Sequence, residues 1–161
     1  MIEDIEKAIV ARLKERLPGR VSRIELFPDK PDNYDFPAAE QAAALVRFSG
    51  ADFAPDDDAF RSTYAPREGL KFQVVFLVRA LRRSDSGPIS AYELKGEIRR
   101  ALHGRSFCGT TPFRPRRFWL DGEHDGVWRW VWEFTASLPS VAEVPNDPDP
   151  WESSPNTKDR S

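Results

Sequence analysis

The sequence predicts an α+β domain in which two helices pack on one face of a largely antiparallel sheet of four to five strands. Two amphipathic stretches predict the helices, and alternating or continuous apolar runs between and after them predict the strands. A chain of 161 residues suits one domain. We expect residues 1–138 to form that domain and residues 139–161 to form a disordered, acidic, proline-rich tail.

The first predicted helix spans residues 2–17. Its apolar residues recur at intervals of three and four, which places them on one stripe: Ile2, Ile5, Ile9, Leu13 and Leu17. Acidic residues at its start and basic residues at its end suit the helix dipole. The Pro18-Gly19 pair ends it.

Three strands are predicted between the helices. Residues 21–27 alternate imperfectly, and residues 42–49 form a short apolar run. Residues 70–80 are apolar on both faces, which indicates a central strand. Residues 28–37 and 50–69 are predicted loops, and the second is about twenty residues long, a length that is typical of functional or mobile segments.

The second helix is predicted over residues 90–102, where Ser90 and Glu93 have the spacing of a capping box. Gly104 is the expected stop after this helix. An irregular stretch is predicted at residues 110–117, followed by a strand that begins at Arg117. A hairpin loop over residues 121–126 then leads into the last strand.

The last strand, residues 127–134, has the most distinctive pattern in the chain. Strict alternation puts Trp128, Trp130, Trp132 and Phe134 on one face. Each aromatic side chain buries about 150–250 Å² when it is covered. Either a helix of the same chain or a neighbouring subunit must therefore cover this face, and we expect the two helices to do so. A platform for a cofactor or sugar is the alternative use of these tryptophans.

Charge and cysteine content narrow the class of protein. The formal net charge of −2 comes from a nearly neutral body and an acidic tail, which gives no general case for nucleic-acid binding. Cys108 is the only cysteine, so it cannot form an intrachain disulfide, and we expect a half-buried thiol. Because no apolar run has the length of a membrane span and the start does not resemble a signal peptide, we expect a cytoplasmic protein.

Two groups of side chains contain residue types that can carry chemistry. Asp56, Asp57 and Asp58 lie in the long loop, but their spacing does not match a calcium-binding loop. We expect a solvated loop or a contact with a basic partner there instead of a metal site. A hydrolase can use a histidine such as His124 as a base, oriented by a carboxylate such as Asp125, but no nucleophile motif accompanies this pair. The sequence therefore predicts a non-enzymatic protein without metal or cofactor.

The middle of the chain is rich in arginine, and aromatic residues interleave with its last group. We select four residues of this group: Arg114, Arg116, Arg117 and Trp119. Arginine beside aromatic residues is found in grooves for single-stranded nucleic acid and is also enriched at protein interfaces. The nearly neutral body favours a protein interface, with a solvated face and nucleic-acid binding as the alternatives.

The order of these elements resembles small proteins of Mu-like prophage tail clusters, a family similar in architecture to the lambda-type tail terminators. The resemblance rests on the opening helix of residues 1–14, the strand Phe72–Val78, the Tyr92-Glu93-Leu94 helix and the Trp130–Phe134 strand. It covers residues 1–138, so it implies a tail-terminator-like domain there. It supplies no catalytic residues.

The resemblance implies a structural role. Tail terminators form a ring, typically hexameric, on the end of the finished tail tube, stop its polymerisation and present the surface for head joining. The expected partners are further copies of the chain, the tail tube protein and a head–tail connector or sheath protein, without a membrane or specific nucleic acid. The expected location is the virion tail, assembled in the cytoplasm of the bacterial host. Alternatives are a head–tail connector or neck protein, and a nucleic-acid-binding module.

Within such a ring, we expect two groups of residues to lie at subunit or partner contacts. They are the acidic group Asp56, Asp57 and Asp58, and the arginine-aromatic group Arg114, Arg116, Arg117 and Trp119. A closed ring requires two unlike surfaces on each subunit, and these two groups are our candidates for them.

Overall fold

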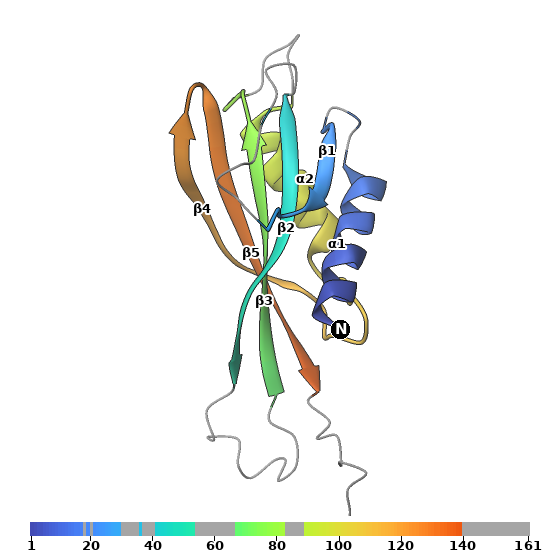
Figure 1. Ribbon diagram of the computed structural model, residues 1–161. Coiled ribbons are helices and arrows are strands. Elements are labelled where there is room, and N and C mark those ends of the chain that lie inside the picture. Colours follow the sequence, from blue (N-terminus) through green and yellow to red (C-terminus); the bar gives the residue numbers. More distant parts are fainter. Residues whose placement is uncertain are drawn as a thin grey trace, which may run out of the picture.

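The computed structural model describes residues 1–17, 19, 21–29, 36, 41–53, 67–82 and 89–139 (Figure 1). These residues contain two helices and five strands: α1 (Ile2–Arg16), β1 (Arg23–Leu26), β2 (Ala42–Phe53), β3 (Arg67–Val78), α2 (Ala91–Leu102), β4 (Arg114–His124) and β5 (Val127–Pro139). The strands form one sheet in the order β1-β2-β3-β5-β4. β1 runs parallel to β2, and every other neighbouring pair is antiparallel. The predicted α+β class is therefore confirmed.

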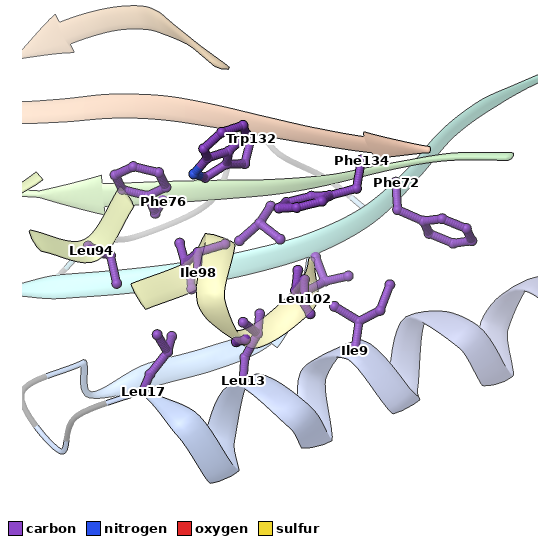
Figure 2. Close-up of a cluster of buried hydrophobic side chains, with 14 of the residues drawn as sticks. Ile9, Leu13, Leu17, Phe72, Phe76, Leu94, Ile98, Leu102, Trp132 and Phe134 are labelled. Atoms are coloured by element: carbon purple, nitrogen blue, oxygen red, sulfur yellow. The ribbon is translucent and has the colours of Figure 1, made fainter. Parts of the chain in front are cut away.

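Both helices pack on the same face of the sheet. Ile5, Ile9 and Leu13 of α1 and Leu94 and Ile98 of α2 are fully buried in one cluster with the even-numbered core residues of β3 and β5. Figure 2 shows side chains of both helices pointing toward the aromatic residues of the strands. The apolar stripes predicted from helical spacing are the buried faces, which confirms both helices.

Polar contacts join the helices to each other and to the sheet. Arg12 Nε donates to the Ala101 carbonyl oxygen at 3.0 Å, which ties α1 to α2. The backbone N–H of Phe48 in β2 donates to Glu6 Oε2 at 3.1 Å. None of the helices in the described ranges is long and apolar enough to cross a membrane.

The tryptophan face of β5 lies beneath α2, as predicted, but the cover is uneven. Trp132 and Phe134 are buried, and Trp132 Nε1 donates to the Lys95 carbonyl oxygen of α2 at 3.1 Å. Trp128 and Trp130 are half-buried at the edge of the core. The Trp130 ring stacks on Phe118 of β4 with centroids 4.9 Å apart. Tyr92 of α2 lies edge-on to the same ring with centroids 6.4 Å apart, so a helix and a neighbouring strand cover Trp130 together.

The start and end of α2 follow the predicted capping. Ser90 is the N-cap: its Oγ accepts from the Glu93 backbone N–H at 3.2 Å and lies 3.3 Å from Glu93 Oε1. At the other end the His103 N–H donates to the Arg99 carbonyl oxygen at 2.9 Å. Gly104 follows with φ +79°, a conformation that glycine adopts without steric cost.

Two strands extend into the predicted loop at residues 50–69. β2 continues to Phe53 and β3 begins at Arg67, so both ends of that loop are strand. The prediction failed because a bulge shifts the register between Phe48 and Gly50, which hides the alternation. The far ends of β2, β3 and β5 project beyond the helices (Figure 1). Residues 54–66 lie outside the described part of the chain.

The last hairpin is longer and tighter than predicted. β4 begins at Arg114, inside the stretch expected to be irregular, and reaches His124. The turn consists of Asp125 and Gly126, whose φ values of +51° and +78° match the two-residue turn that suits twisted strands. Register shifts after Pro115 and Leu120 break the alternation that would have revealed β4. By contrast, β1 is shorter than the predicted strand, residues 21–27.

Cys108 was expected to be half-buried, and this expectation is wrong. The thiol is exposed in a turn that links α2 to β4. The backbone of Cys108 and Gly109 has positive φ, and the turn is closed by the Phe107 N–H donating to Thr110 Oγ1 at 3.1 Å. The flanking Phe107 and Phe113, and not the cysteine, fill the core here.

Candidate functional site

The helices in the described part of the chain cover one face of the sheet, and we call the other the helix-free face. Along each strand its residues alternate with those of the core. Its centre is apolar: Leu45, Val75 and Val131 are at most 2% exposed, with Phe27 and Trp119 packed at the margins. A closed apolar centre on a face without helices requires a different cover.

Arginine side chains supply that cover. The guanidinium carbon of Arg47 lies 4.7 Å from the ring centroid of Phe27, and that of Arg129 lies 5.7 Å from it. The guanidinium carbon of Arg117 lies 4.6 Å from the Trp119 ring. Long cationic side chains thus lay their stems and planar heads over apolar surface.

A chain of hydrogen bonds crosses the face around Glu133, which is only 5% exposed. Glu133 Oε1 accepts from Gln73 Nε2 at 3.1 Å and from Ser49 Oγ at 3.3 Å, and Glu133 Oε2 accepts from Arg116. Gln73 Oε1 in turn accepts from Arg47 Nε at 2.8 Å. These side chains come from β2, β3, β5 and β4, so the network links four strands of the sheet.

The network determines which form of Glu133 is stable. Burial by itself raises the pKa of Glu133, but the hydrogen bonds from Gln73 and Arg116, the positive charge of Arg116 and the Ser49 hydroxyl outweigh it. The pKa of Glu133 is therefore held below its ordinary value. Burial, followed by the nearby charge of Arg129, lowers the pKa of Arg47. The centre of the face holds an ionised carboxylate among cations.

Positive charge on the face is compensated unevenly. Lys71 Nζ lies 2.5 Å from Asp52 Oδ2, and Arg129 Nε lies 2.9 Å from Asp121 Oδ2. Arg116 is paired with Glu133. Arg114 and Arg117, both exposed, have no carboxylate partner among the residues that the structure describes. Uncompensated positive charge is thus concentrated at the start of β4.

The structure brings together four of the seven residues predicted to lie at interfaces. Arg114 pairs across the sheet with Thr135, and Arg117 pairs with Glu133. A register shift leaves Arg116 as the extra residue, and its side chain contacts Glu133, whose backbone pairs with Arg117. Trp119 pairs with Val131 on the same face.

The other three predicted interface residues, Asp56, Asp57 and Asp58, lie outside the described residues. Sequence reasoning also missed Glu133 and its partners. The signal was present in the odd-numbered positions of β5, because a glutamate that alternates with buried aromatics must lie on the opposite face.

The hairpin end of the face carries His124, the candidate base. His124 Nε2 lies 3.2 Å from Asp125 Oδ2, and the two side chains are 93% and 88% exposed. An open hollow of about 550 Å³ beside them has a mixed lining: Phe36, Leu77, Arg79, Asp121, Gly122, Glu123, His124, Asp125, Val127 and Arg129. Small-molecule sites are usually enclosed, unlike this hollow. No group of three potential metal ligands occurs within the described ranges.

The helix-free face ends in a long strand edge. β4 has eleven residues and is the outermost strand on its side, whereas β1, the strand at the other edge, has four. Figure 1 shows β4 at the margin of the sheet farthest from α1. An edge strand presents backbone groups that can pair with another chain.

The model of the Gp37 protein family matches residues 9–154, from α1 through β5 and on into the acidic C-terminal segment. No curated protein matches the chain in sequence.

Proposed function

Because this chain belongs to the phage-related Gp37 protein family, we propose that it terminates a phage or phage-derived tail. Copies of the chain form a ring, typically a hexamer, on the end of the tail tube in the virion. The ring stops polymerisation of the tube and provides the surface to which the head joins. The partners in this proposal are other copies of the chain, the tube protein and a head–tail connector or sheath protein. The chain acts by docking, without catalysis.

The observation that supports this proposal most is the helix-free face with its uncompensated arginines at the β4 edge. A closed ring needs two unlike, complementary surfaces on each subunit. The chain offers a long, cationic edge at β4 and a short edge at β1, at opposite ends of one sheet. The core face is already filled by α1 and α2, so the helix-free side is the part of the sheet left for contacts.

The pairing of cations favours a protein partner over nucleic acid. Three cations of the face, Lys71, Arg116 and Arg129, already contact carboxylates of the same chain. Nucleic-acid affinity depends on cations that are free to neutralise phosphates. We therefore expect little binding to single-stranded DNA even at low salt. Affinity that rises steeply as the salt concentration falls would favour the nucleic-acid alternative.

The exposure of His124 and Asp125 does not favour a catalytic pair. Catalytic bases are usually tuned by burial and fixed partners, and both side chains here lie in water at a hairpin turn. His124→Ala is expected to leave tail assembly unchanged. A loss of assembly in a folded His124→Ala protein would contradict this part of the proposal.

Electron microscopy of particles made without the chain tests the tail-terminator role. We expect tubes of uncontrolled length or tails that fail to join heads. Tails of normal length with heads attached would refute the proposal. Binding of the purified chain to isolated tube ends, compared with binding to the head portal, separates a terminator from a head–tail connector.

A further inference from the structure

We propose that the acidic C-terminal segment, residues 140–161, docks on Arg114, Arg117 and Trp119 of its own chain. The start of β4 is where the helix-free face has exposed guanidinium groups without carboxylate partners among the described residues. Trp119 lies half-buried beside them, under the Arg117 guanidinium. The surface therefore suits a ligand that brings carboxylates together with apolar or aromatic groups.

The C-terminal segment has that composition. It carries five acidic residues and two basic ones: Glu143, Asp147, Asp149, Glu152 and Asp159 against Lys158 and Arg160. Its densest part is the run of residues 147–152, Asp-Pro-Asp-Pro-Trp-Glu, which combines carboxylates with a tryptophan. Segments of this composition can become ordered on a complementary surface.

The length of the chain permits the contact. β5 ends at Pro139, and Arg114 pairs with Thr135, four residues before that end. Returning along four strand residues takes about 13 Å, and one strand spacing adds about 5 Å. The eight residues from Pro139 to Asp147 span up to about 26 Å when extended. Asp147 therefore reaches Arg114 without any change in β5.

The spacing of the charges also agrees. Arg114 and Arg117 lie opposite Thr135 and Glu133, which are two residues apart on β5 and thus about 7 Å apart. Asp147 and Asp149 are likewise two residues apart, and each precedes a proline. A residue before proline is restricted to extended conformations, so less entropy is lost when the segment docks. The Gp37 family match continues to residue 154 and includes this stretch.

This inference goes beyond the proposed function and does not rest on it, because the contact lies within one chain. In the proposed ring, a neighbouring copy that binds the same face would have to displace the segment. The docked segment would then keep the cationic face of a free subunit covered.

Distance measurement between two spin labels on the full-length chain tests the docking. One label is placed on Cys108, which is exposed in the turn before β4, and the other on a Ser153→Cys substitution. At low salt we expect one narrow distance distribution. At 1 M salt, where the screening length is about 3 Å, we expect it to broaden. A broad distribution at low salt would overturn the proposal.

Charge-neutralising variants identify the contact. The narrow distribution should be lost in Arg114→Gln/Arg117→Gln and equally in Asp147→Asn/Asp149→Asn. The second variant changes no residue of β1–β5. The control Arg99→Gln/Arg100→Gln removes two exposed arginines from α2 and should leave the distribution narrow. A distribution that stays narrow in the first two variants would overturn the proposal.

Dilution of the labelled chain with unlabelled chain shows whether the contact lies within one chain. A distance that persists on dilution supports docking on the same chain. A distance that disappears would overturn the proposal in favour of docking on a neighbouring copy.

Discussion

Glu133→Gln should destabilise the fold at neutral pH and have little effect in acid. The Glu133 carboxylate accepts hydrogen bonds from Gln73 and Ser49 on one oxygen and from Arg116 on the other. The amide that replaces it keeps one accepting oxygen but turns its NH₂ group toward the other set of donors. If the oxygen stays with Gln73 and Ser49, the charged bond to Arg116 is lost.

The expected loss in the free energy of unfolding follows from that one lost hydrogen bond. A hydrogen bond to a charged group contributes about 1.5–3 kcal/mol. Because the Arg116 side chain is 49% exposed and can turn to water, we expect the lower part of this range. The substitution should therefore cost about 1.5–2 kcal/mol at pH 7. With a urea dependence of about 1–3 kcal/mol per M, the unfolding midpoint should fall by about 0.5–2 M.

The pH dependence has a definite sign. The pKa of Glu133 is lower in the folded than in the unfolded chain, so the ionised carboxylate stabilises the fold fully above its ordinary pKa of 4.5. That stabilisation disappears as the pH falls through the folded pKa, because the protonated acid then resembles the amide. The difference in the free energy of unfolding between the parent chain and Glu133→Gln should shrink toward zero in acid. Other carboxylates titrate in both proteins, so their contributions cancel in this difference.

Urea unfolding from pH 7 down to pH 3 provides the measurement. Glu97→Gln is the matched control, because Glu97 pairs with Arg100 on the surface of α2 and should change stability by less than about 0.5 kcal/mol. A Glu133→Gln deficit that is constant over this pH range, or absent at pH 7, would refute the account of the network.

Two further substitutions test the core and the last hairpin. Trp132→Ala should lower the free energy of unfolding by about 3–5 kcal/mol, because the side chain is 6% exposed and its Nε1 donates to the Lys95 carbonyl oxygen. A loss below about 1 kcal/mol in urea unfolding would show that α2 does not seal this face. Gly126→Ala should cost about 1–2 kcal/mol because Gly126 has φ +78°. Gly19→Ala, where an added methyl meets no atom within 4 Å and φ is not positive, is its control, and equal losses in thermal unfolding would contradict the turn assignment.

The elements with regular periodicity were predictable from the sequence. Spacing of three and four residues identified α1 and α2, and the Ser90 cap located the start of α2. Alternation identified β5 and correctly separated its aromatic face from the face of Glu133. These features depend on neighbours in sequence, which is why one chain was enough to recognise them.

Strand ends and the polar network were not predictable for a physical reason. Bulges in β2 and β4 change which residues share a face, so the pattern of these strands becomes irregular although their pairing continues. The network around Glu133 joins side chains that are up to 84 residues apart. Only the pairing of strands brings them together. The arginine-aromatic segment was recognised by composition, but its place on the helix-free face came from the register.

Native mass spectrometry of the purified chain, alone and mixed with tail tubes, determines whether the helix-free face at the start of β4 joins copies of the chain into a ring. We expect single subunits from the chain alone, and a closed oligomer of one defined size in the presence of tail tubes for the parent chain and for the control Arg99→Gln/Arg100→Gln. The folded variant Arg114→Gln/Arg117→Gln should remain a single subunit. The same oligomeric state in all three proteins would contradict the account.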